Sequence, residues 1–239
     1  MNPNNSQGFA TMSSAIEYAD NYNLWILGLF AEYIGQSLLE IGTGQGNFKR
    51  YLPQLQHYIS TDVDAEVIAR AQQRDPEGIY IQADVTAAHW GKTVGIQKID
   101  TVLCVNVLEH IPDAPSAVHN MLQILQPGGH LLLFVPAFQA LYSDMDKMAG
   151  HLKRYRKKDI KQLLRDQPAI ALKLEYFNAV GGVGWWANQF FKHDNLDSQA
   201  INRQIQVFDQ YVVPIAKRVD YVTSAFFGQS VIAVIQKTA

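Results

Sequence analysis

A glycine-rich turn and an acidic side chain one strand later are the residues of this chain best suited to bind a nucleotide-like ligand. Gly42, Gly44 and Gly46 follow the apolar run Leu38–Ile41, and Asp62 ends the next apolar run. Glycine has no Cβ, so its backbone takes positive φ angles and approaches a ligand closely. Amides at a helix start attract electronegative groups, and a carboxylate at the next strand tip can bind a ribose diol. The spacing predicts a nucleotide-binding turn, with a helix beginning near Gly46.

Later strand ends carry residues that can extend this site. Asp84 ends the run that starts at Ile79, and the buried-strand pattern Ile99–Val105 leads into the turn 106–113. A Pro-Gly-Gly turn at 127–129 then precedes an apolar strand, 131–135. Dinucleotide enzymes usually carry Gly-x-Gly-x-x-Gly, but Asn47 stands at the position of the third glycine. The glycine turn by itself therefore leaves the ligand open.

Taken together, the segments from 38 to 135 resemble a class I S-adenosylmethionine-dependent methyltransferase, of a bacterial small-molecule subgroup similar to methyltransferase types 11 and 12. The resemblance implies an α/β fold, a Rossmann-like parallel sheet with helices on both faces and an antiparallel last strand. It also implies S-adenosyl-L-methionine as the cofactor. The candidate cofactor-binding residues are Glu40, Gly42, Thr43, Gly44, Gly46, Asp62, Val63, Asp84, Val85, Asn106 and Val107.

Each acid among these residues has a role implied by the resemblance and a structural alternative. Asp62 is expected to hold the ribose hydroxyls, because Asp64 can cap the helix that follows. Asp84 is expected to accept a hydrogen bond from the adenine amino group beside the Val85 amide, and capping the next turn explains it equally well. Glu40 is expected to order the glycine turn.

Two histidines and a tyrosine are the candidate catalytic residues. His110 follows the strand that ends near the transferred methyl group, where an imidazole can take a proton from a hydroxyl; a hydrogen bond in the core explains it equally well. His151 and Tyr155 lie in a segment similar to the Gly-His-x-Arg-Arg-Tyr pattern of a methyltransferase subgroup. Cationic side chains up to Lys161 suit an anionic or sugar-bearing acceptor, although a solvated basic helix start is the simpler interpretation.

The order of elements predicts one methyltransferase domain over residues 1–239. We expect an N-terminal helical lid over 1–35, with a capping box at Ser14, and a cofactor-binding core over 38–135. A substrate-side loop and helices follow over 136–228, and the last strand lies within 229–239. Tyr18, Tyr22 and Trp25 can cover the cofactor, and their helical spacing fits core packing at least as well.

Composition narrows the class of protein. The 239 residues carry a formal net charge of −2 and a single cysteine. We therefore expect no broad attraction to nucleic acid, no intrachain disulfide and a reducing, cytoplasmic location. The polar N-terminus lacks the features of a signal peptide, and no apolar run is long enough to span a membrane. The seven histidines form no His-Glu-x-x-His motif, so the sequence predicts no metal site.

The sequence thus predicts an enzyme that methylates an oxygen or nitrogen of a small-molecule acceptor, which can be sugar-bearing, anionic or lipid-like. A monomer or a homodimer is expected. Two alternatives remain open at this point: an NAD-dependent Rossmann oxidoreductase, and a non-catalytic S-adenosylmethionine-binding protein.

Overall fold

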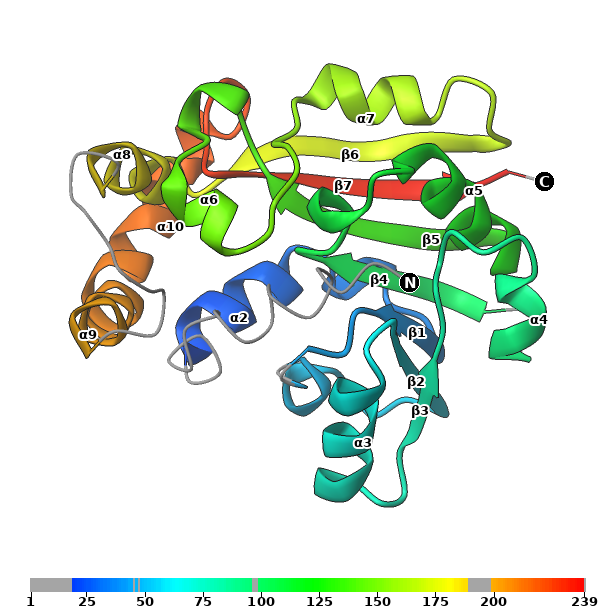
Figure 1. The fold of residues 1–239 in the computed structure, drawn as a ribbon. Helices are drawn as coiled ribbons and strands as arrows, with labels where there is room; N and C mark the ends of the chain where they lie inside the picture. The colour runs from blue at the N-terminus through cyan, green and yellow to red at the C-terminus, as the bar shows by residue number, and fades with distance from the viewer. Residues whose placement is uncertain (1–18, 45, 47, 96–98, 189–198, 239) are drawn as a thin grey trace.

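A mixed seven-stranded sheet organises the part of the chain that the computed structural model describes, residues 19–44, 46, 48–95, 99–188 and 199–238 (Figure 1). The strand order is β3-β2-β1-β4-β5-β7-β6. The first five strands pair in parallel, and β7 inserts antiparallel between β5 and β6. The predicted fold class is therefore confirmed. The strands are β1 Ser37–Ile41, β2 His57–Asp62, β3 Ile79–Gln82, β4 Ile99–Val105, β5 Leu125–Pro136, β6 Ala169–Phe177 and β7 Ser230–Lys237.

Helices cover both faces of this sheet (Figure 1). The α-helices are α2 Asp20–Gly28, α3 Ala65–Arg74, α4 Trp90–Val94, α5 Ala114–Ile124, α6 Asp144–Met148, α7 Lys157–Leu163, α8 Ala179–Asn188, α9 Gln199–Val207 and α10 Val213–Thr223. Short 3-10 turns are η2 Ala31–Tyr33, η3 Lys49–Tyr51, η4 Leu108–His110 and η5 Gln139–Leu141, and a π-helical turn, η6 Phe208–Val212, joins α9 to α10. No helix in the described ranges has both the length and the apolar character needed to cross a membrane.

Two hydrophobic layers hold the helices to the sheet, because side chains of a strand alternate between its faces. Leu38 and Leu103 lie on one face, where they pack with α2 and α10. Leu39 and Val102 lie on the other face, where they pack with α4, α5 and α7. The central strands are buried on both faces, which explains their continuous apolar runs.

The helix predicted to begin near Gly46 is wrong. Among the described residues of this stretch, the 3-10 turn η3 is the only helical element, and the chain is extended at Leu52. Leu52 precedes Pro53, and a residue before proline is pushed out of the α region, so the helix cannot continue past Tyr51. Arg50 and Tyr51 instead hydrogen bond to Asp20 on α2.

Other boundaries differ more modestly from the sequence prediction. The turn predicted at 127–129 belongs to β5, which starts at Leu125 and passes Gly128 at a φ of 82°. The N-terminal helix is described only from Asp20, and Ser14 and Tyr18 lie outside the described residues. Tyr22 packs edge-on against Phe177, so this part of the predicted lid is core packing.

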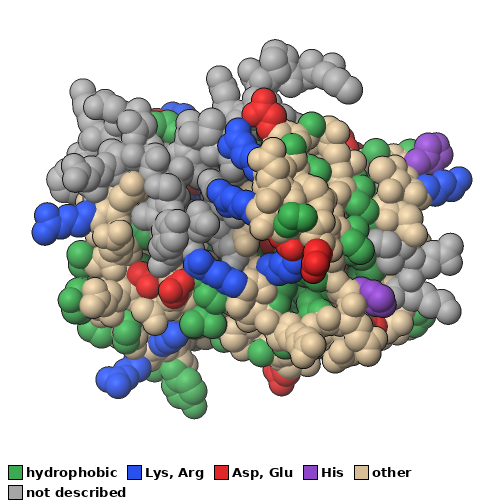
Figure 2. Space-filling model, turned by 90° about the horizontal axis from the view of Figure 1, so that it is seen from below, with side chains coloured by type: hydrophobic (Ala, Val, Ile, Leu, Met, Phe, Trp, Pro, Cys, Tyr) green, Lys and Arg blue, Asp and Glu red, His purple; other side chains and the backbone are tan. Residues whose placement is uncertain are grey.

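Charge is mixed on the face of the molecule that Figure 2 shows. Figure 2 shows Lys and Arg side chains interspersed with Asp and Glu on the face seen from below. This agrees with the formal net charge of −2. A mixed surface provides no strong field of one sign to steer a polyanion toward this face.

Two glycines provide a matched test of the packing at the junction of β6 and β7. A Cβ at Gly228 would lie 2.7 Å from the Phe177 carbonyl carbon and would overlap the backbone there, whereas a Cβ on Gly184 in α8 meets nothing within 4 Å. We expect Gly228→Ala to lower the free energy of unfolding by about 1–3 kcal/mol through overpacking. Gly184→Ala should be neutral or raise it by up to about 1 kcal/mol, because alanine favours helix. Urea unfolding of both variants measures the difference, and equal midpoints would contradict the described junction.

Candidate functional site

The glycine turn follows β1 directly and is held against β2. The amides of Gly42 and Thr43 both donate to the Thr61 carbonyl, at 2.7 and 3.0 Å. Gly42, Gly44 and Gly46 have φ angles of 82°, 50° and 74°, a region that only glycine enters at little cost. The turn therefore needs its glycines, as the sequence predicts.

A buried chain of hydroxyl groups connects this turn to Glu40 inside the sheet. Ser60 Oγ donates to Glu40 Oε2 at 2.8 Å and lies 2.6 Å from Thr43 Oγ1. The Tyr58 hydroxyl also donates to Glu40. Burial raises the pKa of the Glu40 carboxyl to about 7, against the opposing effect of these hydrogen bonds. Glu40 thus orients Ser60, and Ser60 fixes the side chain of the turn residue Thr43.

Asp62, the last residue of β2, contacts the glycine turn across the sheet edge. Its Oδ2 accepts from the Gly44 amide at 3.3 Å and its Oδ1 accepts from the Asp64 amide at 3.0 Å. Burial raises the pKa of the Asp62 carboxyl, partly offset by these bonds. Asp64 caps α3 by accepting from the Glu66 amide at 2.8 Å, and Val63 is 47% exposed beside it. The helix cap is therefore Asp64, and Asp62 lies toward the turn.

Asp84 and Val85 follow β3 at the same edge of the sheet. Asp84 is exposed, and its Oδ1 accepts from both the amide and the hydroxyl of Thr86, at 2.8 and 2.7 Å. Val85 is buried, and its carbonyl accepts from Asn120 of α5. The local turn described by the capping alternative is thus present at Asp84.

Asn106 and Val107 follow β4, next to the end of β1. Asn106 has a φ of 53°, which asparagine tolerates better than most residues, and its amide donates to the Phe134 carbonyl at 2.8 Å. Val107 packs so closely to Gly42 that a Cβ on Gly42 would overlap it. The two turns, after β1 and after β4, are therefore in direct contact.

Glu109, His110 and His151 converge beyond the end of β4. The rings of His110 and His151 have centroids 4.9 Å apart, and His151 Nε2 lies 3.8 Å from Glu109 Oε1. His151 Nδ1 pairs with Asp146 Oδ1 at 2.8 Å, and His110 Nδ1 pairs with the carbonyl of Gly150 at 3.2 Å. Burial and the neighbouring His151 lower the pKa of His110 to about 4, so its imidazole is neutral at pH 7. Burial raises the pKa of Glu109 to about 7, against the attraction of His151.

The basic segment has two parts: Arg156, Lys158 and Lys161 at the start of α7 are exposed, as the solvated alternative predicts, whereas Arg154 and Tyr155 before them are buried. Arg154 is 5% exposed and binds Asp146 through both Nε and Nη2, at 2.8 and 3.1 Å. The Leu152 amide donates to the Glu109 carbonyl at 2.8 Å. Tyr155 is 1% exposed, and its hydroxyl donates to the Leu108 carbonyl at 3.0 Å. The segment is thus fastened to the turn after β4, with Tyr155 beneath that turn.

Sequence reasoning missed Asp146 and Ser60. Asp146 holds both His151 and Arg154, but Ser143-x-x-Asp146 is a capping-box pattern, and the capping box is also present. The spacing therefore gives a sufficient local reason for an acid there. Ser60 lies within a strand, and its contact with Glu40 comes from pairing of β1 with β2, in which the two residues are partners.

A family model described as a methyltransferase domain matches residues 16–167, more than half of the chain. The chain belongs to the S-adenosylmethionine-dependent methyltransferases. The predicted class and enzyme activity are therefore confirmed, and the NAD-dependent oxidoreductase alternative falls away.

Relatives and solved structures agree with this methyltransferase assignment. A protein named ubiquinone biosynthesis O-methyltransferase, from Cupriavidus pinatubonensis, is 27% identical over 111 residues, 46% of this chain and 44% of that relative. The chain thus spans less than half the length of the relative it matches. At the level of fold, a Bacillus halodurans methyltransferase structure has a TM-score of 0.60, 16% identity, and covers 91% of this chain and 100% of its own. The N-methyltransferase NodS from Bradyrhizobium japonicum, crystallised with S-adenosylhomocysteine, has a TM-score of 0.55 and 16% identity. The match covers 92% of this chain and 87% of NodS.

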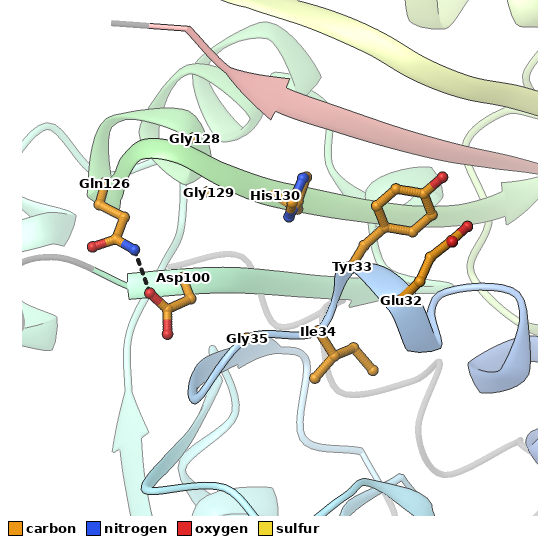
Figure 3. A pocket seen from close by; sticks show the side chains of 9 residues that line it. All are labelled: Glu32, Tyr33, Ile34, Gly35, Asp100, Gln126, Gly128, Gly129 and His130. Carbon is orange, nitrogen blue, oxygen red and sulfur yellow. Dashed lines mark hydrogen bonds between the residues drawn. The ribbon is translucent and has the colours of Figure 1, made fainter.

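A pocket of about 240 Å³ lies at the amino ends of β1 and β4, at the opposite end of these strands from the glycine turn (Figure 3). It surrounds Asp100 near the start of β4 and includes Tyr33 and His130. Asp100 accepts from the amides of Gln36 and Ser37, at 2.9 Å each, and from the Gln126 side chain. Asp100 therefore ties the start of β1 to β5, which is a structural role away from the glycine turn.

The buried Glu40 predicts a pH-dependent stability. Its pKa of about 7 in the folded enzyme exceeds the usual 4.5, so the folded state holds this proton more tightly than the unfolded chain does. The free energy of unfolding of wild type, relative to Glu40→Gln, should therefore fall as pH rises from 4.5 to 7, by up to about 3 kcal/mol. Urea unfolding at pH 5, 6, 7 and 8 measures the difference.

Glu77→Gln is the matched control, because Glu77 is exposed. The difference in free energy of unfolding between Glu77→Gln and wild type should stay constant over the same pH range. If the difference in free energy of unfolding between wild type and Glu40→Gln also stays constant with pH, Glu40 does not hold its proton more tightly in the folded state.

Proposed function

We propose that this methyltransferase moves the methyl group of S-adenosylmethionine to an oxygen, or secondarily a nitrogen, of a small organic acceptor. The observation that carries the proposal is the contact of the glycine turn with Asp62 and with Val107 at the carboxyl edge of β1, β2 and β4. Ligands of open α/β sheets bind at such an edge, where the strand order reverses. Here the reversal lies between β1 and β4.

The geometry of the turn fits an adenosylmethionine ligand. Among the described residues, a Cβ on Gly46 would meet nothing within 4 Å and one on Gly44 would meet only the Gly42 carbonyl, at 4.0 Å, so these residues leave room for a ligand beside the turn. Asp62 borders that space with a carboxylate suited to a ribose diol. The residues proposed to hold the cofactor are Glu40, Gly42, Thr43, Gly44, Gly46, Asp62, Val63, Asp84, Val85, Asn106 and Val107.

We propose that Asp84 has both of the roles considered for it, the cap of its own turn and the contact with adenine. Only its Oδ1 accepts from Thr86, so the same carboxylate can brace its own turn and receive an adenine amino group on its other oxygen. Asn106 and Val107 would lie on the opposite side of the glycine turn from Asp62. The cofactor would then extend along the edge from β3 toward β4.

The acceptor is proposed to lie beside His110 and His151. When bound, the cofactor supplies an activated methyl group, so the chain mainly has to orient the acceptor and keep water away. A neutral His110 can accept a hydrogen bond or a proton from the hydroxyl group of the acceptor. It can instead bind a Lewis acid, which would promote ionisation of that hydroxyl group. Tyr155 would act as a positioning residue through Leu108. The name of the O-methyltransferase relative favours oxygen over nitrogen as the methylated atom.

Replacing one of two neighbouring acids tests the cofactor site. Asp62→Asn should weaken binding of S-adenosylhomocysteine about 10- to 100-fold, because a hydrogen bond to a charged group contributes about 1.5–3 kcal/mol. Asp64→Asn is the matched control, since asparagine caps a helix as well as aspartate does, and its affinity should match wild type. Calorimetric titration measures both variants, with NAD as the comparison ligand. Equal loss in the two variants, or tighter binding of NAD, would contradict the site.

The same variants test the reaction. Radiolabelled S-adenosylmethionine incubated with wild-type enzyme and a low-molecular-mass cell extract should give labelled small molecules that chromatography separates from the cofactor. The label should fall with Asp62→Asn and not with Asp64→Asn. Label confined to added protein or nucleic acid would contradict a small-molecule acceptor, and no label in any fraction would support the non-catalytic alternative.

A further inference from the structure

Glu109 presents an unusual electrostatic problem beside the two histidines. Its side chain is fully buried, and neither carboxylate oxygen has a hydrogen-bond partner among the described residues. Leaving a buried carboxylate unpaired is costly, and such groups are normally neutralised, paired or bound to a cation. The nearest ionisable partner is His151 Nε2, at 3.8 Å, which is too far for a hydrogen bond. The described residues therefore leave both oxygens of this carboxyl group open to a proton or a cation.

Both histidines beside Glu109 are oriented through one ring nitrogen, which leaves the other available. His110 Nδ1 lies 3.2 Å from the Gly150 carbonyl, which can only accept, so Nδ1 carries the hydrogen. His151 Nδ1 lies 2.8 Å from Asp146 Oδ1, and Asp146 is held in turn by Arg154. Metal-binding histidines characteristically donate one ring N–H to a carbonyl or a carboxylate, which fixes the tautomer and the ring. Each Nε2 is then a lone-pair donor.

Glu109, His110 and His151 place one ligand atom each within 4.8 Å of one another. Two ligands of a tetrahedral zinc ion lie about 3.3 Å apart, given zinc–ligand distances of about 2.0–2.1 Å. Binding of an ion would therefore require the three ligand atoms to move closer together by small side-chain rotations. The His151 side chain is 15% exposed, which leaves an ion a way in.

The two segments that carry these ligands are fastened together by other bonds. The Leu152 amide donates to the Glu109 carbonyl at 2.8 Å, and Tyr155 donates to the Leu108 carbonyl at 3.0 Å. The cluster is thus a built site. A search for linear motifs misses it, because His151 joins the cluster through the folded segment 144–155.

We propose that Glu109, His110 and His151 bind one divalent transition-metal ion, of which Zn²⁺ is the best match. Two imidazole nitrogens and one carboxylate suit Zn²⁺ and its neighbours, whereas Mg²⁺ and Ca²⁺ select sites made of oxygen. The expectation of no metal site, drawn from motifs alone, is replaced by this cluster. Three protein ligands leave a coordination position open, as in catalytic zinc sites.

The open position gives the ion a role that rests on the proposed function. An acceptor hydroxyl bound there would lose its proton more easily, because a cation lowers the pKa of a coordinated oxygen. The hydroxyl proton would leave to solvent, the oxygen would form the new bond to the methyl carbon, and the carbon–sulfur bond of the cofactor would break. His110 then acts as a metal ligand rather than as the base.

Titration of Zn²⁺ into the full-length, chelator-treated enzyme tests the site without cofactor or acceptor. We expect one ion per chain, and at least 100-fold weaker binding for His110→Ala and His151→Ala. Glu109→Gln, which keeps the shape of the side chain, should weaken binding at least 10-fold. His119→Ala is the matched control, because His119 contacts Gln167 on another part of the surface, and its affinity should equal that of wild type.

Two further measurements keep the outcome decisive. The visible spectrum of the Co²⁺-loaded wild-type enzyme should show ligand-field bands of a low-coordinate nitrogen and oxygen site, which requires no variant to fold. Binding of S-adenosylhomocysteine should be unchanged in the histidine variants, which verifies their fold. Absence of saturable Zn²⁺ binding, equal affinity in wild type and His151→Ala, or preference for Mg²⁺ would overturn the metal site. None of these results would touch the proposed methyl transfer, which fails instead if S-adenosylhomocysteine does not bind.

Discussion

The parallel pairing of β1 with β4 is the constraint on which the rest of this methyltransferase depends. These strands are neighbours in the sheet although two strands separate them in the sequence. After β1 the chain continues to β2 on one side of this pair, and after β4 it continues to β5 on the other side. The turn after β1 and the turn after β4 therefore meet, and Gly42 lies against Val107 with no room for a side chain. The proposed contacts to the cofactor and the acceptor start from these two turns, from Asp62 and the segment 144–155 that are bonded to them, and from the turn after β3 at the same end of the sheet.

The segment between β5 and α7 packs against the turn after β4. This segment is long and charged, and one ion pair within it is buried inside the protein. Arg154 and Asp146 form a two-point contact, with Trp185 of α8 against the guanidinium group. Breaking such a buried pair on one side leaves an uncompensated charge, so the segment has a strong reason to keep a single position. This position brings His151 to His110.

Most strands and their assembly into a parallel sheet could be predicted from the sequence, because buried parallel strands give continuous apolar runs that polar turns interrupt. β4 matches the predicted run Ile99–Val105, and the antiparallel last strand is where the resemblance implies it. Helix limits were less predictable. Phe48 to Leu52 has a helical pattern, yet Pro53 and the contacts with Asp20 reduce it to one 3-10 turn.

The site was predictable where a residue acts through its own position in a turn, as at Gly42 and Asp62. It was not predictable where a role arises from tertiary contact. Asp146 follows a capping pattern that explains it locally, and Arg154 reads as part of a basic run until its burial is known. Glu109 shows its unpaired carboxylate only once the segment 144–155 is folded over it.

A crystal structure of the enzyme with S-adenosylhomocysteine, with anomalous data at the zinc edge, tests the central claim most directly. We expect the adenosine ribose at Asp62 and the homocysteine sulfur beside Asn106 and Val107. The sulfur should be directed toward the cluster of Glu109, His110 and His151, with an anomalous peak between these three side chains. Adenosine bound at the Asp100 end of β4, or a sulfur directed away from His110, would contradict this claim.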